Sequence, residues 1–328
     1  MNGQTIKTKV VAEEIERLYG SDAVYKIDTH GIISVLMLPA KLFYALCVCR
    51  NIVILPAQRA LLMESVFLRL LNVFFRKNIH YVVIGGWIAN HLQKHPLVAA
   101  SVKSFRGIYV EVKTLLHQLE CLGCPNVYVL PNCKKLPIVE NVSSSLTENK
   151  LRLVLFSRIM KEKGIEDAVA VVRKLNEMED GKVYALDIYG PIDYNQIEWF
   201  NHVKKMFTPQ INYRGEVQYE NSVAVLKNYH LLLFPTYYEG ECFAGTIIDA
   251  FASGLPVIAS NWKFNSDVIE NGRTGFLFKP HDEKDMIDKI IQLSDNPELR
   301  SEMSQNCIDM AKMYMPEFAL RQLFENFL

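Results

Sequence analysis

Short runs of apolar residues recur along the chain, and segments with helical spacing separate them. In the first half these runs predict strands at 23–29, 51–57, 80–86, 107–112 and 126–131; in the second half they predict strands at 151–157, 183–189, 211–215, 230–235, 256–260 and 275–278. The runs are apolar almost throughout, which is typical of parallel strands covered on both faces. Between them, a helical stripe predicts one buried helix face, made by Ile165, Ala168, Val169, Val172 and Leu175. We therefore expect an α/β fold with two doubly wound parallel sheets and a ligand between them, at the carboxyl ends of the strands.

A polar, serine-rich segment at 136–150 separates the two sets of strands. It predicts an N-terminal domain at 1–137 and a C-terminal domain at 138–315. The segment 316–328 starts at a proline and reads as an amphipathic helix, which we expect to pack back on the first domain.

The first domain opens unusually. Gly3, Gln4 and Thr5 resemble the glycine-containing loop that follows a first strand, and residues 10–20 resemble the helix after it, but no strand precedes them. Either the start is shortened or the domain lacks its opening strand. Because a missing central strand would leave strand edges unpaired, we favour a shortened start.

Composition sets the class of protein. The chain has 328 residues, 50% of them hydrophobic and 22% charged, which is typical of a globular protein with two domains. Lys plus Arg and Asp plus Glu number 36 each, so net charge gives no support for nucleic-acid binding. Residues 1–150 nevertheless hold 17 basic against 10 acidic residues, which leaves the remainder acidic and suggests that the two halves face different partners.

The seven cysteines predict neither a disulfide scaffold nor a metal site, because Cys121 and Cys124 lack a second pair of ligands. The N-terminus is polar and has no secretory signal. The most apolar stretch, about residues 31–57, is interrupted by Pro39, Lys41 and Arg50, so it is not expected to span a bilayer. We expect a soluble protein of the cytoplasm.

Two segments of the second half carry candidate chemistry. Arg158 follows a predicted strand, and Lys163 lies directly before Gly164 and a helix; two cations at a helix N-terminus suit a diphosphate. The alternative is that both are solvated loop cations. Further on, a loop carries Glu239 and Glu241 and a helix carries Asp249, so that carboxylates can reach hydroxyl groups in one crevice. The alternative here is a solvated Glu239 and an Asp249 that only favours the helix dipole.

Over about residues 126–300 these segments resemble the retaining glycosyltransferases of family 4, which have the GT-B fold of two Rossmann-like doubly wound domains facing across a cleft. The resemblance rests on the Arg-x4-Lys-Gly spacing at 158–164, the Glu-x7-acid spacing at 241–249 with Gly-Leu-Pro-Val at 254–257, the NGRTGFLF segment at 271–278 and VLPN at 129–132. The first domain matches weakly, through an opening similar to that of polysaccharide-assembly members.

The resemblance implies a role for each matching position. Arg158 and Lys163 would hold the donor diphosphate as catalytic cations, and Glu241 would bind hydroxyls of the transferred sugar. Asp249 stands where the family usually has a ribose-binding Glu, and Cys242 stands where it usually has Gly. The remaining donor-binding positions would be Gly190 near the base and the segment made of Phe243, Ala244, Gly245 and Thr246.

The implied reaction is retaining transfer of a hexosyl group from a nucleotide-sugar, expected to be UDP-linked, through an oxocarbenium-like transition state. The leaving phosphate would deprotonate the acceptor, so no protein nucleophile is required. The chain has no Asp-x-Asp sequence, and we expect neither a metal nor another cofactor.

The acceptor side gives a weaker signal. Gly3, Gln4, Gly86 and His91 are the candidate residues. A basic amphipathic face with Arg59, Arg69, Arg76 and Lys77 favours a glycan or polyprenyl-diphosphate-linked acceptor at the inner face of the cell membrane, in surface polysaccharide or capsule biosynthesis. A solvated helix face is the alternative for that stretch.

Two other functions stay open. The chain could be a non-catalytic GT-B partner of a glycosyltransferase complex, or a nucleotide-sugar epimerase with the same fold. A nucleotide-dependent dehydrogenase is disfavoured, because no Gly-x-Gly-x-x-Gly sequence follows a strand.

Overall fold

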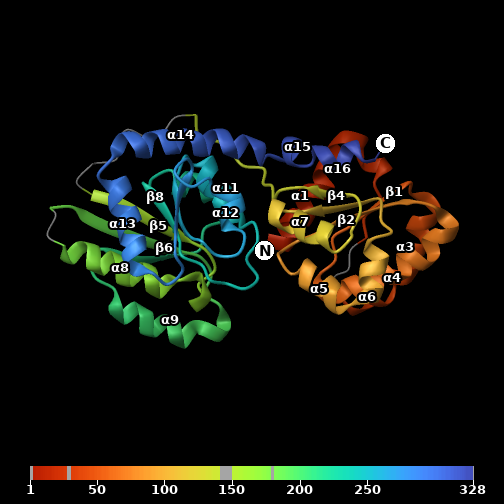
Figure 1. The fold of residues 1–328 in the computed structure, drawn as a ribbon, viewed down its shortest axis with the longest axis horizontal. Helices are drawn as coiled ribbons and strands as arrows, with labels where there is room; N and C mark the ends of the chain where they lie inside the picture. Colours follow the sequence, from red (N-terminus) through yellow and green to blue (C-terminus); the bar gives the residue numbers. More distant parts are fainter. Residues whose placement is uncertain (1–2, 28–30, 141–149, 179–180, 328) are drawn as a thin grey trace. The chain divides into compact units, whose positions relative to one another are not determined.

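The computed structural model describes residues 3–27, 31–140, 150–178 and 181–327. The chain divides into two compact units: unit 1 comprises residues 1–134 and 316–328, and unit 2 comprises residues 135–315. Each unit is a parallel β-sheet with helices on both faces (Figure 1). The predicted α/β class with two parallel sheets is confirmed. Most of the predicted 136–150 linker, residues 141–149, lies outside the described residues, and the acceptor and donor roles of the two domains stay predictions.

Unit 1 has four strands and nine α-helices among its described residues. In chain order they are α1 (Gly3–Tyr19), α2 (Ile32–Leu36), α3 (Leu38–Val48), β1 (Asn51–Ile54), α4 (Gln58–Phe75), β2 (Asn78–Val82), α5 (Ile88–Lys94), α6 (Pro96–Val102), β3 (Gly107–Val110), α7 (Lys113–Cys121), β4 (Val127–Val129), α15 (Pro316–Ala319) and α16 (Arg321–Glu325).

The sheet of unit 1 runs in the order β1-β2-β3-β4, with every pair parallel. Right-handed crossovers between strands in this order place the connecting helices α4 to α7 on one face. The other face is covered by α1, α15 and α16, whose Val11, Leu320 and Leu323 pack on Val82 and Tyr109 of the sheet. Figure 1 shows α15 and α16 on one side of these strands and α5 and α6 on the other.

Three sequence predictions for unit 1 are wrong. Residues 24–27 form no strand; Tyr25 instead packs its ring against Tyr44 of α3, with ring centroids 5.3 Å apart. Gly3 to Thr5 are not a loop but the first turn of α1. In place of the single helix expected at 316–328, the described residues 316–327 hold two short helices. Within the described part of the chain, no strand precedes β1.

Unit 2 has six strands and seven α-helices among its described residues. They are β5 (Lys150–Phe156), α8 (Ile165–Glu177), β6 (Val183–Tyr189), α9 (Ile197–Val203), β7 (Ile211–Gly215), α10 (Ser222–Leu226), β8 (Leu231–Phe234), α11 (Gly245–Ala252), β9 (Val257–Ser260), α12 (Asn265–Val268), β10 (Gly275–Phe278), α13 (Glu283–Ser294) and α14 (Pro297–Met313).

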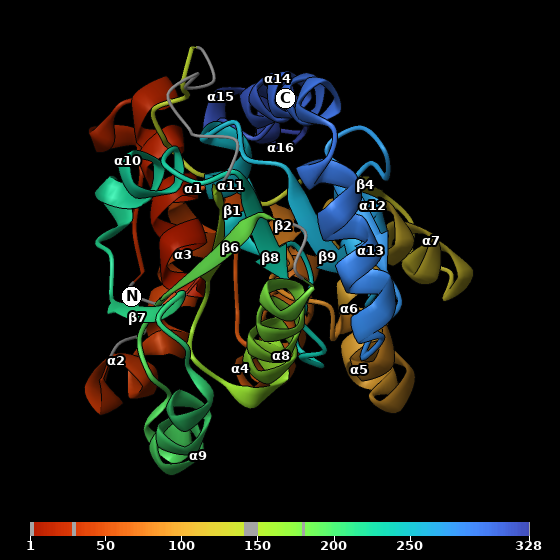
Figure 2. The ribbon, with the colours of Figure 1, turned by 90° about the vertical axis from the view of Figure 1, so that its left-hand side faces the viewer.

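The sheet of unit 2 runs in the order β10-β9-β8-β5-β6-β7, all parallel, so the strand order reverses between β5 and β8. All six strands predicted from the second half of the sequence are confirmed. Helices α8 and α13 cover one face and α11 covers the other, as Figures 1 and 2 show. A reversal of this kind opens a crevice at the carboxyl ends of the two central strands, where ligands bind in doubly wound sheets.

No helix in the described ranges is both long and apolar enough to cross a bilayer.

Candidate functional site

Two loops leave the carboxyl ends of β5 and β8 and are locked together. Gly164, which ends the first loop, has a φ of +70°, and a Cβ atom there would lie 2.1 Å from the carbonyl oxygen of Pro235. The amide of Tyr237 in the second loop donates to the Glu162 carbonyl at 2.8 Å. Only glycine permits this approach, so the Lys-Gly sequence is needed to bring the first loop onto the second.

Lys163 and Glu241 meet where these loops touch. The Lys163 ammonium lies 2.5 Å from a carboxylate oxygen of Glu241, and the two side chains are only 12% and 9% exposed. The hydroxyl of Thr236 donates to the same oxygen at 2.9 Å, and the ring of Tyr238 lies 4.9 Å from the Lys163 ammonium. Glu239, in contrast, is 75% exposed and pairs with Lys263. Glu241 is therefore the carboxylate of this loop that points inward.

Arg158 lies in the first loop but stays half-exposed. Its guanidinium is 3.6 Å from a carboxylate oxygen of Asp193, too long for a tight ion pair, so it remains accessible to an anion. Gly190 follows β6 with a φ of +137°, and a Cβ atom there would lie 1.8 Å from the carbonyl oxygen of Ser157. Gly190 therefore sits directly against the loop that carries Arg158.

The third part of the site is the start of α11. The Thr246 hydroxyl donates to the Phe156 carbonyl at 2.6 Å, which fixes this helix start against the end of β5. The first N–H groups of a helix have no carbonyl in a preceding turn, so α11 begins at Gly245 with donors that need acceptors outside the helix. Phe243 packs edge-on against Tyr314, and the Cys242 side chain is buried.

Asp249 is buried in α11, where it is 2% exposed. One of its carboxylate oxygens accepts a hydrogen bond from the hydroxyl of Ser222 at 3.0 Å, at the start of α10. The structure thus ties Asp249 to α10, a contact that the sequence spacing did not indicate, and its role toward a ribose stays a prediction.

The candidate acceptor residues lie on three elements of unit 1. Gly3 and Gln4 form the start of α1, Gly86 lies in the turn after β2, and His91 lies in α5. His91 Nδ1 is 3.3 Å from the Gln58 side-chain amide; its Nε2 is buried and has no hydrogen-bond partner among the described residues. Burial, and after it the charge of His95, lower the pKa of His91. The structure thus buries the Nε2 atom of His91, and its contact with an acceptor stays a prediction.

A buried ion pair in unit 1 was missed by the sequence analysis. Lys7 of α1 lies 2.7 Å from Glu111, directly after β3, and the two side chains are 1% and 4% exposed. The other oxygen of Glu111 accepts from the Gly85 amide at 3.4 Å. The pair joins α1 to the loop that carries Gly86, and only the position of Glu111 at the end of a buried strand could have indicated it.

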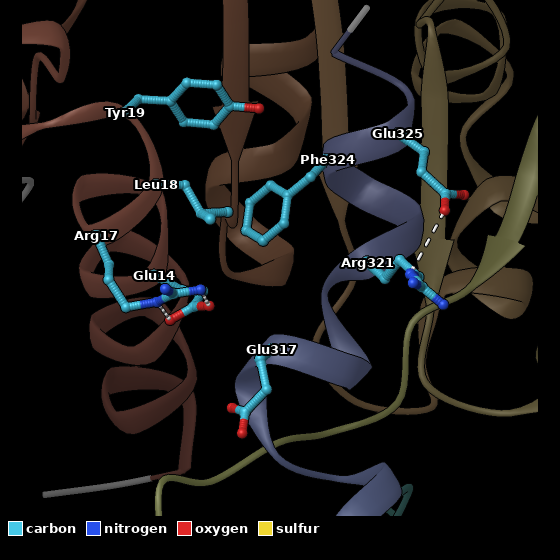
Figure 3. Close-up of a pocket in the computed structure, with 8 residues that line it drawn as sticks. All are labelled: Glu14, Arg17, Leu18, Tyr19, Glu317, Arg321, Phe324 and Glu325. Atoms are coloured by element: carbon cyan, nitrogen blue, oxygen red, sulfur yellow. Dashed lines mark hydrogen bonds and ion pairs between the residues drawn. The ribbon is translucent and has the colours of Figure 1, made fainter.

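A hollow of about 330 Å³ lies between α1 and α15–α16 of unit 1 (Figure 3). Leu18, Tyr19 and Phe324 gather at one end of it. Arg17 is paired with Glu14 at 2.7 Å, and Arg321 lies 3.7 Å from Glu325. Its lining has three carboxylates against these two arginines, so the hollow does not favour an anionic ligand.

The cysteine pair and a buried histidine lie outside these loops. Cys121 is exposed and Cys124 is buried, both as free thiols, and the described residues include no group of three or more His, Cys, Asp or Glu placed to hold a metal. His80 is fully buried in β2, where its Nδ1 lies 3.0 Å from the Tyr109 hydroxyl.

The model of the glycosyl transferases group 1 family matches residues 140–310, which is more than half of the chain. An uncharacterized glycosyltransferase of Methanocaldococcus jannaschii is 24% identical over 170 residues, which cover 50% of this chain and 41% of that protein. The capsular polysaccharide biosynthesis glycosyltransferase CapM of Staphylococcus aureus is 27% identical over 150 residues, covering 45% of this chain and 38% of CapM. The chain thus spans less than half the length of these two relatives.

Solved structures share the fold. Anabaena HepE in complex with UDP superposes with a TM-score of 0.70 at 15% identity, covering 88% of this chain and 81% of HepE. S. aureus TarM in complex with fondaparinux, α-GlcNAc-glycerol and UDP gives a TM-score of 0.61 at 20% identity, covering 76% of this chain and 51% of TarM. The fold is of the GT-B type, and the chain belongs to the glycosyl transferases group 1 family.

Proposed function

We propose that this group 1 glycosyltransferase is a retaining enzyme of family 4 that transfers a hexosyl group from a UDP-sugar to a glycan or lipid-linked acceptor in surface polysaccharide biosynthesis. The observation that carries the proposal is the inward-facing pair of Lys163 and Glu241 at the carboxyl ends of β5 and β8. The UDP in the HepE and TarM complexes supports the choice of nucleotide.

The pair suggests how a donor is received. Lys163 holds the Glu241 carboxylate, and a diphosphate is a stronger anion that can take its place. Lys163 then neutralises the phosphate oxygens together with the accessible guanidinium of Arg158. The released Glu241 carboxylate becomes an acceptor for hydroxyl groups of the sugar, while the Thr236 hydroxyl keeps it in place.

Charge stabilisation of the leaving group drives the reaction. As the bond between the sugar and the diphosphate lengthens, negative charge grows on the phosphate oxygens, and two fixed cations lower the energy of that state without reorganising. The N–H groups at the start of α11 add dipoles of the same sign. A phosphate oxygen takes the acceptor proton on the same face of the sugar, so the anomeric configuration is retained and the protein needs no metal and no nucleophile.

The acceptor would bind to unit 1. His91 lies on α5, which follows the Gly86 turn, and α1 contributes Gly3 and Gln4. A polyprenyl-diphosphate-linked glycan at the inner face of the cell membrane suits the basic character of this half of the chain.

The test is a calorimetric titration with UDP, with GDP as the competing nucleotide. We expect saturable UDP binding that weakens by about 10- to 150-fold in Lys163→Ala and in Arg158→Ala, because each removes a charged hydrogen bond worth about 1.5–3 kcal/mol. Lys161→Ala is the matched control, since Lys161 lies in the same loop but is exposed. Arg158→Ala also tests the site without disturbing the fold, because the partner of Arg158, Asp193, is 3.6 Å away.

Mass spectrometry of the products then separates the functions. A glycoside formed from a UDP-sugar supports transfer, whereas an epimerised nucleotide-sugar would replace the proposal. Absence of binding to both nucleotides in a folded protein would point to a non-catalytic partner protein and refute it.

A further inference from the structure

Helix α4 leaves several large apolar side chains exposed. Its buried side holds Leu61 and Leu68 together with Glu64 and Ser65. On the opposite side, Leu70, Val73 and Phe74 are 64%, 69% and 82% exposed. A surface helix of a globular protein normally presents charged residues outward and apolar residues inward, so this arrangement requires a reason.

Helix α3 extends the same apolar surface. Phe43, Tyr44 and Val48 are 48%, 52% and 55% exposed. The ring of Phe43 packs edge-on against Phe75 of α4, with centroids 5.6 Å apart, so the two helices present one continuous surface. We call the exposed apolar residues of α3 and α4 the outer face. Contiguous apolar surface of this extent marks an interaction site.

Basic residues outnumber acidic ones in the part of the chain that forms the outer face. Between residues 32 and 77 the sequence has six basic residues and a single acidic one, the buried Glu64. The basic residues are Lys41, Arg50, Arg59, Arg69, Arg76 and Lys77. Arg59, Arg69 and Arg76 are exposed, and none of the three forms an ion pair with a described residue. The surroundings of the outer face are therefore positive.

A second copy of the chain fits this face poorly. In a two-fold symmetric dimer the same patch meets itself, which would bring the arginines of one copy against those of the other. An anionic bilayer fits both the apolar surface and its positive surroundings. Acyl chains take up the apolar side chains, and arginines reach the anionic headgroups at the ends of their long stems.

We propose that α3 and α4 dock on an anionic bilayer, with Phe74, Val73 and Phe43 inserted among the lipids and Arg69 and Arg76 bound to the headgroups. The inference rests on the proposed function and deepens it, since docking would bring the enzyme to the bilayer that holds a lipid-linked acceptor. Binding to the bilayer can be measured without any acceptor.

The experiment is co-sedimentation of the full chain with phosphatidylcholine vesicles, with and without about a third of phosphatidylglycerol. We expect binding only to the anionic vesicles, and weaker binding as salt is added. Val73→Ser/Phe74→Ser and Arg69→Gln/Arg76→Gln should each reduce the partition coefficient by about tenfold or more. Lys9→Gln/Phe318→Ser, which removes one exposed cation and one exposed aromatic ring elsewhere in unit 1, should bind as the wild type does.

Two further measurements make the result unambiguous. UDP titration of every variant should match the wild type, because all of these residues lie in unit 1. A wild type that fails to bind UDP but still sediments with anionic vesicles would refute the proposed function and leave the docking surface supported. The docking surface is overturned if the wild type does not sediment, if the two double variants sediment as well as the control, or if sedimentation velocity shows a wild-type dimer that Val73→Ser/Phe74→Ser dissociates.

Discussion

Glu64 should make unit 1 lose stability as the pH rises. Burial raises the pKa of this carboxyl from 4.5 to about 7, and it faces Tyr81, whose buried hydroxyl has no hydrogen-bond partner among the described residues. The folded state therefore binds the proton more tightly than the unfolded state. Stability is full below about pH 4.5 and falls as the pH rises through about 7. At about 1.4 kcal/mol per pKa unit, the loss at pH 8 is about 3 kcal/mol.

Glu64→Gln removes this titration, so it should raise the free energy of unfolding by up to about 3 kcal/mol at pH 8 and change it little at pH 5. The assay is urea unfolding followed by tryptophan fluorescence. Of the three tryptophans, only Trp87 lies in unit 1, so the measurement uses a background in which Trp199 and Trp262 are phenylalanine. Glu120→Gln, at an exposed position in the same unit, is the control. An equal effect of Glu64→Gln at pH 5 and pH 8 would refute the reasoning.

Two more predictions concern unit 2. Gly190→Ala should lower the free energy of unfolding by more than about 3 kcal/mol, because its Cβ would overlap the Ser157 carbonyl. Gly215→Ala is the control: Gly215 also has a positive φ but no atom within 4 Å of the added Cβ, so the cost should be about 1 kcal/mol. Equal melting temperatures of the two variants in thermal unfolding would contradict the clash. Burial lowers the pKa of His230 to about 4, so the unfolded state binds the proton more tightly and unit 2 should lose stability as the pH falls from 6.5 to about 4. In His230→Asn the side-chain oxygen can still accept from the Arg152 amide, so this variant should lose less free energy of unfolding between pH 6.5 and 4 than the wild type. The measurement is urea unfolding followed at Trp199, and an unchanged pH dependence would exclude His230 as its source.

The sequence predicted unit 2 better than unit 1 because of how their strands are buried. Strands such as Leu231–Phe234 and Val257–Ser260 are buried at every position, and this produces uninterrupted apolar runs that are easily recognised. The run at 23–29 is equally apolar at its start, but Ala23 and Tyr25 are exposed and residues 24–27 pair with no strand. A short apolar run predicts burial, but it becomes a strand only where the fold offers it a neighbouring strand to pair with.

Parts of the candidate site could be predicted from the sequence and parts could not. The spacing of Arg158, Lys163 and Glu241 placed all three at the ends of two strands, and the structure has them there. The direct contact between Lys163 and Glu241 could not be predicted, because it depends on how closely Gly164 approaches Pro235. Partners far apart in the chain, such as Ser222 for Asp249 and Lys7 for Glu111, cannot be matched to each other from local spacing.

The passage of the chain from unit 1 to unit 2 and back has a consequence for biosynthesis. Ala319, Leu320, Leu323 and Phe327 belong to the core of unit 1, although all of unit 2 is translated before them. On the ribosome, unit 2 can fold as soon as residue 315 has emerged. The face of the first sheet that carries α1 still lacks α15 and α16 at that point. Val10, Val11 and Val82 then remain exposed to chaperones and proteases for the whole synthesis of unit 2. A protein cut after residue 315 would keep that exposure permanently, so unit 1 should be the part that is degraded first.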